Sequence, residues 1–207
     1  LLLNFALPPM VDALLGRPRL ARLCRERRLP CRVVRDVNGP TFRDALTRSG
    51  ADLLLTFHFD QILSAETIAS VARGGINVHP GLLPAHRGPT PTVHALLDDP
   101  VVFGVTIHRL VAEIDAGAIL AQRAMADGPG LTALDAARRL HGLAGDLLDE
   151  VLPALAAGRA EERAVQPSPY RSFPTAAEMA RLARSGRRAA GWSDLWRVIR
   201  SAGRPAA

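Results

Sequence analysis

The chain contains 207 residues, a length typical of one domain or of one domain with a short appendage. Apolar residues make up 48% and charged residues 22% of it, which is a globular composition and argues against disorder. No uncharged apolar run approaches ~18 residues, so no membrane span is expected, and the apolar start lacks the features of a signal peptide. Cys24 and Cys31 are too few for a disulfide framework or a zinc site, so a reduced, cytoplasmic compartment is the default expectation.

The positive charge is concentrated at one end of the chain. All 26 basic residues are arginine, against 20 acidic residues, which gives a net charge of +6. Residues 171–207 contain eight arginines but only Glu178 and Asp194 as acidic residues, so this segment accounts for the whole excess. The main body is electrically balanced, and its composition gives no reason to expect a nucleic-acid partner.

Strand-like and helix-like segments alternate along the first 158 residues, which predicts an α/β fold with a mostly parallel sheet. The apolar run at 52–57 is typical of a central, buried strand. Thr41 is predicted to cap the second helix and Gly50 to end it. Strands are expected at 1–5, 32–37, 52–57, 75–79, 102–109 and 118–123, and helices at 18–28, 41–49, 65–73 and 132–157.

The last fifty residues differ in character from the rest. Residues 160–177 are rich in proline, serine and charge and are predicted to be a linker. Helical character resumes at 178–201, where Trp192, Trp196 and Ile199 form an i, i+4, i+7 stripe. Such a stripe is expected to pack on the protein's own core or on a second copy, which would make a homo-oligomer; binding of RNA or an acidic carrier is the less favoured alternative.

One stretch, NVHPGLLPAHRG at 77–88, carries the chemistry. Asn77 and His79 lie two apart on a predicted strand and therefore point to the same side of it. Pro80 ends the strand, so both lie at its carboxyl end, where open α/β sheets bind ligands. Asp115 follows in a predicted loop between two later strands. Each residue alone has an ordinary structural explanation, as a turn asparagine, a core histidine or an aspartate in a turn.

The order of NVHPGLLPAHRG, GVTIH and DAG resembles the formyltransferase family that uses 10-formyltetrahydrofolate. The hallmark of that family is N-x-H-P-S-L-L-P-x-x-R-G, followed by G-x-T-x-H and D-x-G. It includes glycinamide ribonucleotide formyltransferase, the catalytic domain of methionyl-tRNA formyltransferase, sugar and amino-acid N-formyltransferases and formyltetrahydrofolate hydrolase. The resemblance covers roughly residues 30–158 and implies a Rossmann-like formyltransferase fold with a mostly parallel sheet, followed by a short helical tail.

The resemblance implies a catalytic trio of Asn77, His79 and Asp115. Asn77 and a protonated His79 would donate hydrogen bonds to the oxyanion formed when an amine attacks the formyl carbon, and one such donor is worth roughly 10²–10³ in rate. Asp115 would keep His79 charged by raising its pKa and would pass the amine's proton on through water. His108 is the best supporting candidate, and no metal is expected.

The resemblance also implies a folate pocket formed by the loop after the central strand, largely through its backbone, with the segment after Gly81 as a second wall. Gly81 stands where the family often has serine, and Arg87 and Gly88 are expected to shape the loop rather than to act chemically. The expected pocket residues are Phe59, Asp60, Gln61, Ile62, Leu63, Leu82, Leu83 and Pro84.

Residues 1–158 are expected to form the catalytic domain, without the family's first strand–helix unit, and residues 159–207 a linker and a basic, amphipathic helical tail. The absence of a glycine-rich phosphate turn disfavours a glycinamide ribonucleotide substrate, and the short tail disfavours tRNA. The leading hypothesis is a cytoplasmic N-formyltransferase that moves the formyl group of 10-formyltetrahydrofolate to the primary amine of a small metabolite, an amino sugar or a non-standard amino acid. The alternatives are a formyltetrahydrofolate hydrolase and a non-catalytic module that binds folate or a partner.

Overall fold

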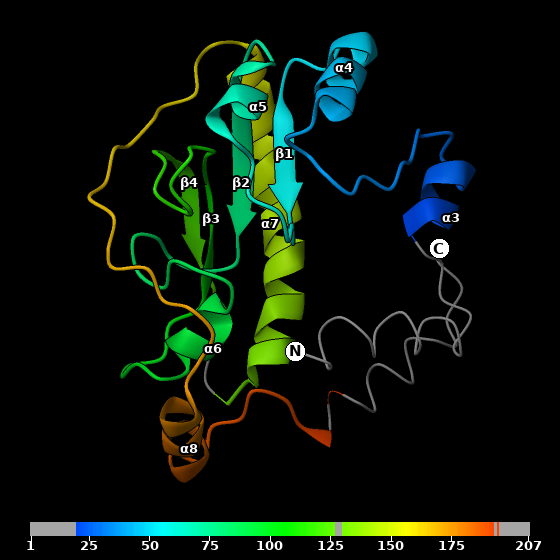
Figure 1. Cartoon of the computed structure of the whole chain (residues 1–207). Helices are drawn as coiled ribbons and strands as arrows, with labels where there is room; N and C mark the ends of the chain where they lie inside the picture. Colours follow the sequence, from blue (N-terminus) through cyan, green and yellow to red (C-terminus); the bar gives the residue numbers. More distant parts are fainter. Residues whose placement is uncertain (1–19, 127–129, 193, 195–207) are drawn as a thin grey trace. The chain divides into compact units, whose positions relative to one another are not determined.

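The computed structural model describes residues 20–126, 130–192 and 194 (Figure 1). They belong to two units, Asp36–Ala190 and a smaller one formed by the described residues before and after it. The smaller unit contains helix α3 (Leu20–Glu26), which lies inside the predicted helix at 18–28. The strand predicted at 1–5 lies outside the described residues.

The strand predicted at 32–37 does not form. Val33 is 96% exposed, and arginines at 32 and 35 flank the valine pair, so the segment has no continuous apolar face to bury against a sheet. The prediction of a strand is therefore wrong here, because two adjacent valines between two arginines do not supply the apolar face that a strand buries.

The unit Asp36–Ala190 is built around a four-stranded sheet of order β1-β2-β3-β4. Strand β1 runs parallel to β2, whereas β3 is antiparallel to both of its neighbours. The α/β class is confirmed, but the prediction of a mostly parallel sheet is wrong for the described strands, because β3 is antiparallel to both β2 and β4. The loop between β3 and β4 is too short for the crossover that a parallel pair needs. The strands are β1 (Leu54–Phe57), β2 (Gly75–His79), β3 (Gly104–Arg109) and β4 (Ile119–Ala124).

The helices predicted at 41–49, 65–73 and 132–157 correspond to α4, to a shorter α5 and to α7, whereas α6 was not predicted. Helix α4 begins at Pro40, with Gly39 rather than Thr41 as its N-cap, because a proline ring has the backbone angle of a first helical residue and lacks the N–H that would go unbonded there. It ends at Gly50, as predicted. The helices are α4 (Pro40–Ser49), α5 (Ala65–Ala69), α6 (Pro91–Ala95), α7 (Ala133–Ala156) and α8 (Ala176–Arg184).

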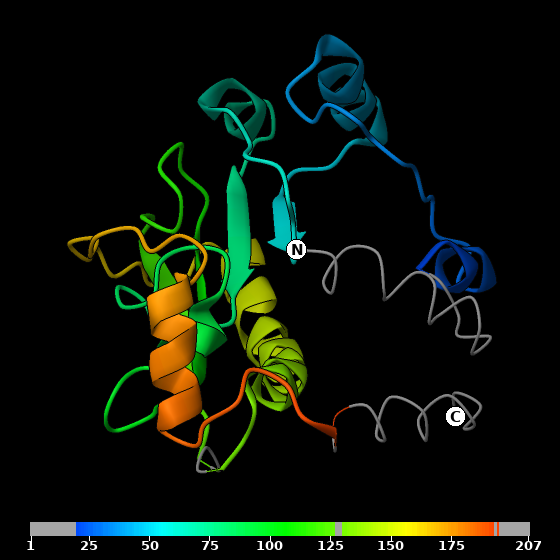
Figure 2. The same cartoon turned by 60° about the horizontal axis from the view of Figure 1, so that its bottom comes forward.

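The long helix α7 covers one face of the sheet (Figures 1 and 2). Alternate residues of β2 and β3 point toward it, and the apolar side chains of both layers interdigitate to form the core. Burial of this area is the main source of stability, at about 25 cal/mol per Å² of apolar surface. The central members of the core are Ile76, Val78, Val105, Ile107, Ala136, Leu140, Ala144, Leu147 and Val151.

The chain after α7 does not behave as a separate tail. It runs back along the β4 side of the sheet before entering α8 (Figure 1), and Arg163 pairs with Ile119 of β4. Leu182 of α8 is 2% exposed and belongs to the core. The stretch without helix ends at Thr175, because α8 begins at Ala176, two residues before the end of the predicted linker at 160–177. Residues on both sides of Gly158 belong to the unit Asp36–Ala190.

Part of the predicted helix at 178–201 is α8, which ends at Arg184, and residues 185–191 are not helical. Trp192 and Asp194 are helical, and 193 and 195–201 lie outside the described residues. Of the predicted stripe, Trp192 is 77% exposed, whereas Trp196 and Ile199 lie outside the described residues. The packing of the stripe therefore stays a prediction.

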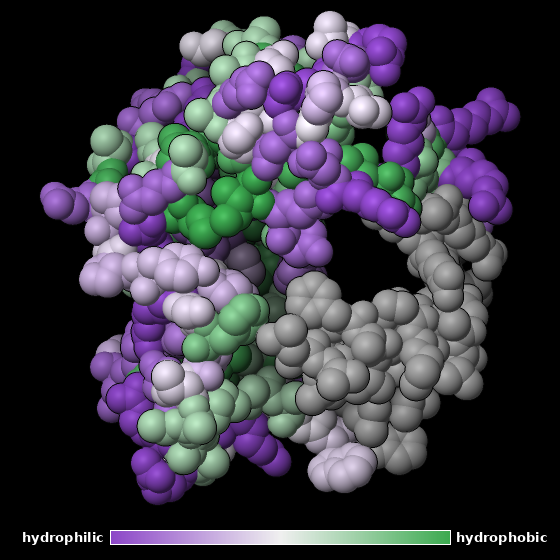
Figure 3. Space-filling view, viewed as in Figure 1, coloured by the Kyte–Doolittle hydropathy of each residue, from purple (hydrophilic) through white to green (hydrophobic). Residues whose placement is uncertain are grey.

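Strand β1 lies at the edge of the sheet, and α7 covers it incompletely. Its residues Leu55 and Phe57 are 47% and 41% exposed on the α7 face. Figure 3 shows apolar surface interspersed with polar surface on the side of the molecule seen in Figure 1. Among the described residues, no helix combines the length and the apolar character needed to cross a membrane.

Candidate active site

The face of the sheet opposite α7 carries two rows of polar side chains that run across the strands. In the first row, Thr56 of β1 is in register with Asn77 of β2, which is in register with His108 of β3. In the second row, His79 is in register with Thr106, which is in register with Gln122 of β4. Because side chains alternate between the two faces of a strand, the polar residues of all four strands lie on one surface of the sheet.

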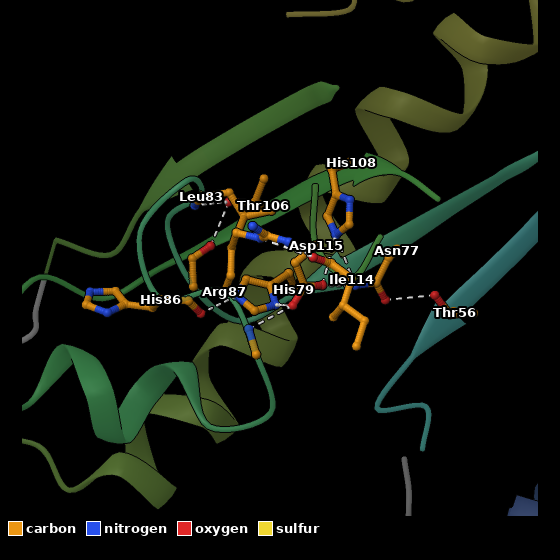
Figure 4. Close-up of polar contacts among 12 residues, drawn as sticks. Thr56, Asn77, His79, Leu83, His86, Arg87, Thr106, His108, Ile114 and Asp115 are labelled. Carbon is orange, nitrogen blue, oxygen red and sulfur yellow. Dashed lines mark hydrogen bonds and ion pairs between the residues drawn. The ribbon is translucent and has the colours of Figure 1, made fainter. Parts of the chain in front are cut away.

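The first row is a chain of hydrogen bonds (Figure 4). Thr56 Oγ1 donates to Asn77 Oδ1 at 2.7 Å, and the Asn77 amide nitrogen lies 3.1 Å from His108 Nε2 and 3.3 Å from Asp115 Oδ1. His108 Nδ1 donates to the carbonyl of Arg109 at 2.9 Å, so its Nε2 can accept from Asn77. A reversed amide would place the Asn77 oxygen against the Asp115 carboxylate, so the amide orientation is fixed.

Asp115 lies in the loop between β3 and β4 and connects the two rows. Its Oδ1 contacts Asn77, and its Oδ2 lies 3.5 Å from His79 Nδ1 and accepts the Gly88 N–H at 3.0 Å. Arg87, 4% exposed, donates to the carbonyl of Ile114 at 3.1 Å, directly before the aspartate. Asp115 has a φ of 50°, a left-handed conformation that aspartate tolerates better than most residues. The Arg–Gly pair of the motif therefore holds the loop that presents Asp115.

His79 is buried, and the surroundings of its ring determine its proton. Its Nε2 lies 3.1 Å from the carbonyl of His86, which can only accept, so Nε2 carries the hydrogen. Burial lowers the pKa of His79 to about 4, since the charge of Asp115 acts in the opposite direction without outweighing it. The prediction of a charged His79 is therefore wrong for this structure at neutral pH, because the sequence does not show how completely the ring is buried.

Asp115 is ionised at neutral pH. Burial opposes ionisation of its carboxyl, but the interactions with the neighbouring His108 and His79 rings and the N–H of Gly88 outweigh it and lower the pKa of Asp115 below its usual value. An ionised carboxylate then faces the lone pair of His79 Nδ1. Two acceptors at this distance repel each other, and a proton placed between them would be shared by both.

The second row supports the segment that follows His79. Thr106 Oγ1 accepts the N–H of Leu83 at 3.1 Å and donates to the carbonyl of Gly81 at 2.6 Å, and Gln122 donates to the carbonyl of Leu83 at 2.7 Å. A Cβ at Gly81 would lie 2.8 Å from His79 Nε2, so the glycine allows the segment to pass close to the ring.

The residues predicted for the folate pocket belong to two segments, the loop after β1 and the segment after β2. The loop after β1 starts two residues beyond Thr56, and Phe59 and Ile62 are 45% and 60% exposed, whereas Leu63 is buried. The Gln61 side chain accepts the Val37 N–H, and the carbonyl of Ile62 accepts a hydrogen bond from the Asn38 side chain. These two bonds attach the loop to residues 37 and 38. Asp60 is exposed.

The second predicted wall is less accessible. Leu83 is 3% exposed, so its side chain offers little surface to a ligand. Leu82 and Pro84 are half-buried, and Leu82 lines a hollow of about 480 Å³ together with Ala85 and His86. That hollow is not lined by any of Asn77, His79 and Asp115.

Two members of the rows, Thr56 and Gln122, fall outside the motifs found in the sequence, and Thr106 appears there only as part of GVTIH. Thr56 is the one polar residue in the strand run LLTF of β1, and that interruption of an apolar strand was a usable signal. Gln122 stands next to Arg123 in the second half of β4, as an ordinary surface residue would, so nothing in the sequence marked it. Among the described residues, no group of three or more His, Cys, Asp or Glu side chains is arranged to bind a metal ion.

A family model described as "Formyl transferase" matches residues 27–152, more than half of the 207 residues. The chain belongs to the formyl transferase family. The matched region contains Asn77, His79 and Asp115, all three members of the predicted trio.

Solved structures of this family resemble the chain. A sugar N-formyltransferase from a Shewanella species is 28% identical, with a TM-score of 0.58 over 67% of this chain and 55% of that one. A glycinamide ribonucleotide transformylase from Symbiobacterium toebii is 27% identical, with a TM-score of 0.55 over 62% of each chain. The formyltransferase PseJ from Anoxybacillus kamchatkensis, solved with tetrahydrofolate and a UDP-linked formamido sugar, is 24% identical, with a TM-score of 0.52 over 59% of this chain and 64% of that one. The chain thus spans between 55% and 64% of the length of these three proteins.

Proposed function

We propose that this protein is an N-formyltransferase that moves a formyl group from 10-formyltetrahydrofolate to the primary amine of a small metabolite. The observation that carries the proposal is the position of Asp115, whose two carboxylate oxygens contact Asn77 at 3.3 Å and face His79 at 3.5 Å. An amide donor, an ionised carboxylate and a neutral imidazole in this arrangement suit acyl transfer to an amine, which needs a donor for the developing oxyanion and an acceptor for one proton.

An amino sugar is the preferred acceptor, and a non-standard amino acid the alternative. The similarity to a sugar N-formyltransferase at 28% identity supports the amino sugar. PseJ, solved with a formamido sugar and tetrahydrofolate, shares the fold and supports the pairing of folate with a sugar amine. A glycinamide ribonucleotide transformylase is similar to nearly the same extent, at 27% identity, so the choice of acceptor rests on the experiment described below.

The His79–Asp115 pair would take the proton that the amine loses on attack and would return it to the folate nitrogen when the bond between that nitrogen and the formyl carbon breaks. Because Nε2 of His79 donates to the His86 carbonyl, its Nδ1 is the free basic position, and this nitrogen faces Asp115 Oδ2. A proton held between these two atoms relieves their repulsion, so the pair is a better base than a buried imidazole alone. The pKa of His79, about 4, already includes the charge of Asp115, so the pair would hold this proton only briefly.

Asn77 would donate to the oxygen that gains negative charge. Both N–H groups of its amide are engaged at rest, one near His108 Nε2 and one near Asp115 Oδ1, and the contact to Asp115 is the longer. When Asp115 shares the transferred proton, its hold on this N–H weakens, which releases a donor as the oxyanion forms. A donor of this kind contributes roughly 10²–10³ in rate.

The residues of the loop after β1 fit a folate. Phe59 and Ile62 supply exposed apolar surface for a flat ring system, and the loop begins beside the Thr56 end of the first row. The bound folate would supply the formyl carbon, and Asn77, His79 and Asp115 would act on it.

The direct test is incubation of the protein with 10-formyltetrahydrofolate and a panel of amino sugars, nucleotide-linked amino sugars and diamino acids, followed by mass spectrometry. We expect slow release of tetrahydrofolate without an amine, since water is an unpositioned nucleophile, and a rise of orders of magnitude with the correct amine. An N-formyl product identifies the acceptor.

Two outcomes contradict the proposal. Fast release of formate without any amine identifies a hydrolase. Folate binding without release under any condition identifies a non-catalytic module. The Asp115→Asn variant is the control, because it should bind folate and form product about 10²–10⁴-fold more slowly.

A further inference from the structure

Residues 168–172, here termed the clamp segment, lie against the loop at 84–88 although about eighty residues separate them in sequence. The N–H of Arg171 donates to the carbonyl of Arg87 at 2.9 Å. A Cβ built on Gly88, which has a φ of 123°, would overlap the carbonyl oxygen of Arg171, so the two backbones are in direct contact. The clamp segment follows the region 27–152 that the family model matches.

Side chains add further contacts between the clamp segment and this loop. The Ser168 carbonyl accepts from Arg87 Nη1 at 2.7 Å, and the Ser168 hydroxyl donates to the carbonyl of Pro84. His94 of α6 donates to the carbonyl of Ser172 at 2.8 Å, which holds the far end of the segment.

The three loop residues under the clamp segment each hold one part of the candidate site. The carbonyl of His86 accepts from His79 Nε2, Arg87 donates to the carbonyl of Ile114, and the N–H of Gly88 donates to Asp115 Oδ2. Displacement of this loop would therefore move the proton on His79 and the carboxylate of Asp115 together. Figure 4 shows Arg87 close to Ile114, Asp115 and His79, with His86 at one side of this group and its ring pointing away.

We propose that the clamp segment positions the catalytic groups, with Arg171 and Ser168 acting as positioning residues through His86, Arg87 and Gly88. The inference rests on the proposed function only in that it assigns a catalytic role to His79 and Asp115. The contacts themselves are independent of the acceptor and of the folate.

The Arg171 side chain is the accessible point at which the clamp segment can be tested. Its guanidinium lies 3.4 Å from His86 Nδ1, 3.5 Å from Glu178 and 3.9 Å from Asp98. Asp98 in turn lies 2.9 Å from His86 Nε2, so His86 is held between a carboxylate and a guanidinium. Burial lowers the pKa of His86; Asp98 raises it, and Arg171 and His94 lower it.

The test compares Arg171→Ala, Arg171→Lys and Ser168→Ala with the matched control Arg181→Ala, an exposed arginine of α8. For Arg171→Ala we expect kcat to fall about ten- to a hundredfold with little change in KM for 10-formyltetrahydrofolate, because misplaced catalytic groups slow the reaction without removing binding surface. Arg171→Lys should restore part of kcat, and Arg181→Ala should match the parent protein.

Imidazole NMR gives a second readout that needs no turnover. Loss of the Arg171 charge should raise the pKa of His86, and the Nε2–H signal of His79 should shift in both Arg171→Ala and Ser168→Ala. A shift in His79 supports the clamp even if no amine on the panel is formylated, which keeps this test separate from that of the proposed function. Unchanged His79 signals in both variants would overturn the inference, and so would parent-like kcat in Arg171→Ala. Ser168→Ala, which removes only one hydroxyl, decides the matter if Arg171→Ala does not fold.

Discussion

The two faces of β2 and β3 are made by alternate residues of the same short strands, yet they are stabilised by different forces. Toward α7, the side chains of Ile76 and Val105 are completely buried among apolar neighbours. Toward the site, His79 and Thr106 are almost as deeply buried, at 3% and 0% exposure, although they are polar. Depth of burial is thus nearly equal on the two faces, and only the partners differ.

The comparison shows where the fold can tolerate change. An apolar face loses stability in proportion to the volume removed, whichever residue is trimmed. A buried polar face is stable only while each donor and acceptor has its partner, because an orphaned group costs about 1–3 kcal/mol. We therefore expect substitutions toward α7 to change stability and substitutions toward the site to change chemistry.

The largest expected effect is on the polar face, in Asp115→Asn. Removal of the negative charge abolishes the proton-sharing pair with His79, and we expect formyl transfer to fall about 10²–10⁴-fold. Circular dichroism should show the fold retained. Asp149→Asn, an exposed position on α7, is the matched control. Turnover within a few-fold of the parent protein would remove Asp115 from the mechanism.

The complementary change on the apolar face is Ile107→Ala. Ile107 is 0% exposed and packs beneath α7, so we expect the free energy of unfolding to fall by about 2–5 kcal/mol. The fraction that remains folded should keep parent-like kcat, since Ile107 points away from the site. Urea titration measures the first quantity, and Leu134→Ala, at a residue 49% exposed, should show almost no loss. A specific loss of kcat with unchanged stability would contradict the separation of the two faces.

The polar face should also make stability depend on pH. The pKa of His79 is about 4 in the folded protein, against 6.5 as its ordinary value. The unfolded chain therefore binds a proton that the folded protein does not, and stability falls as the pH falls from about 6.5 to about 4, by roughly 3 kcal/mol in all. Below about 4 this contribution becomes constant.

His58, His86 and His141 have lowered pKa values too, because of burial, and they act in the same direction. The measurement is therefore a difference: urea titrations at pH 7 and pH 4.5 for the parent protein and for His79→Gln. The parent should lose more stability than the variant over this interval. Equal losses would mean that His79 is protonated in the folded protein.

The sequence predicted the positions of the strands and of the candidate residues better than the directions of the strands and the contacts between distant segments. The strands β1 to β4 follow apolar runs, and the three candidate residues lie in a linear motif, so both could be predicted without coordinates. Strand direction could not, because parallel and antiparallel strands share the same period of two. The charge of His79 was also inaccessible, since it depends on a carbonyl from His86 and on complete burial of the ring. The clamp segment left no signal, because several of its contacts are made by backbone groups such as the Arg171 N–H and the Ser168 carbonyl.

The smallest expected effect is at the end of the first row, in Thr56→Val. Valine keeps the shape of threonine and removes only the hydroxyl that donates to Asn77 Oδ1 at 2.7 Å. A neutral hydrogen bond contributes about 0.5–1.5 kcal/mol, and half-buried Asn77 can take a water in its place, so stability should change by less than about 1 kcal/mol.

Turnover should be more sensitive than stability at this position. Without the hydroxyl, the Asn77 amide is oriented only by His108 and Asp115, and one of these contacts must loosen when the oxyanion forms. We expect kcat to fall roughly two- to tenfold, which is the rate equivalent of one neutral hydrogen bond. Thr56→Ser, which keeps the hydroxyl and loses a methyl group, should retain kcat and lose a little stability instead. If instead the serine variant were slower than the valine variant, Thr56 would support the site by packing and not by its hydrogen bond. The polar face would then not act through hydrogen bonds at the edge strand β1.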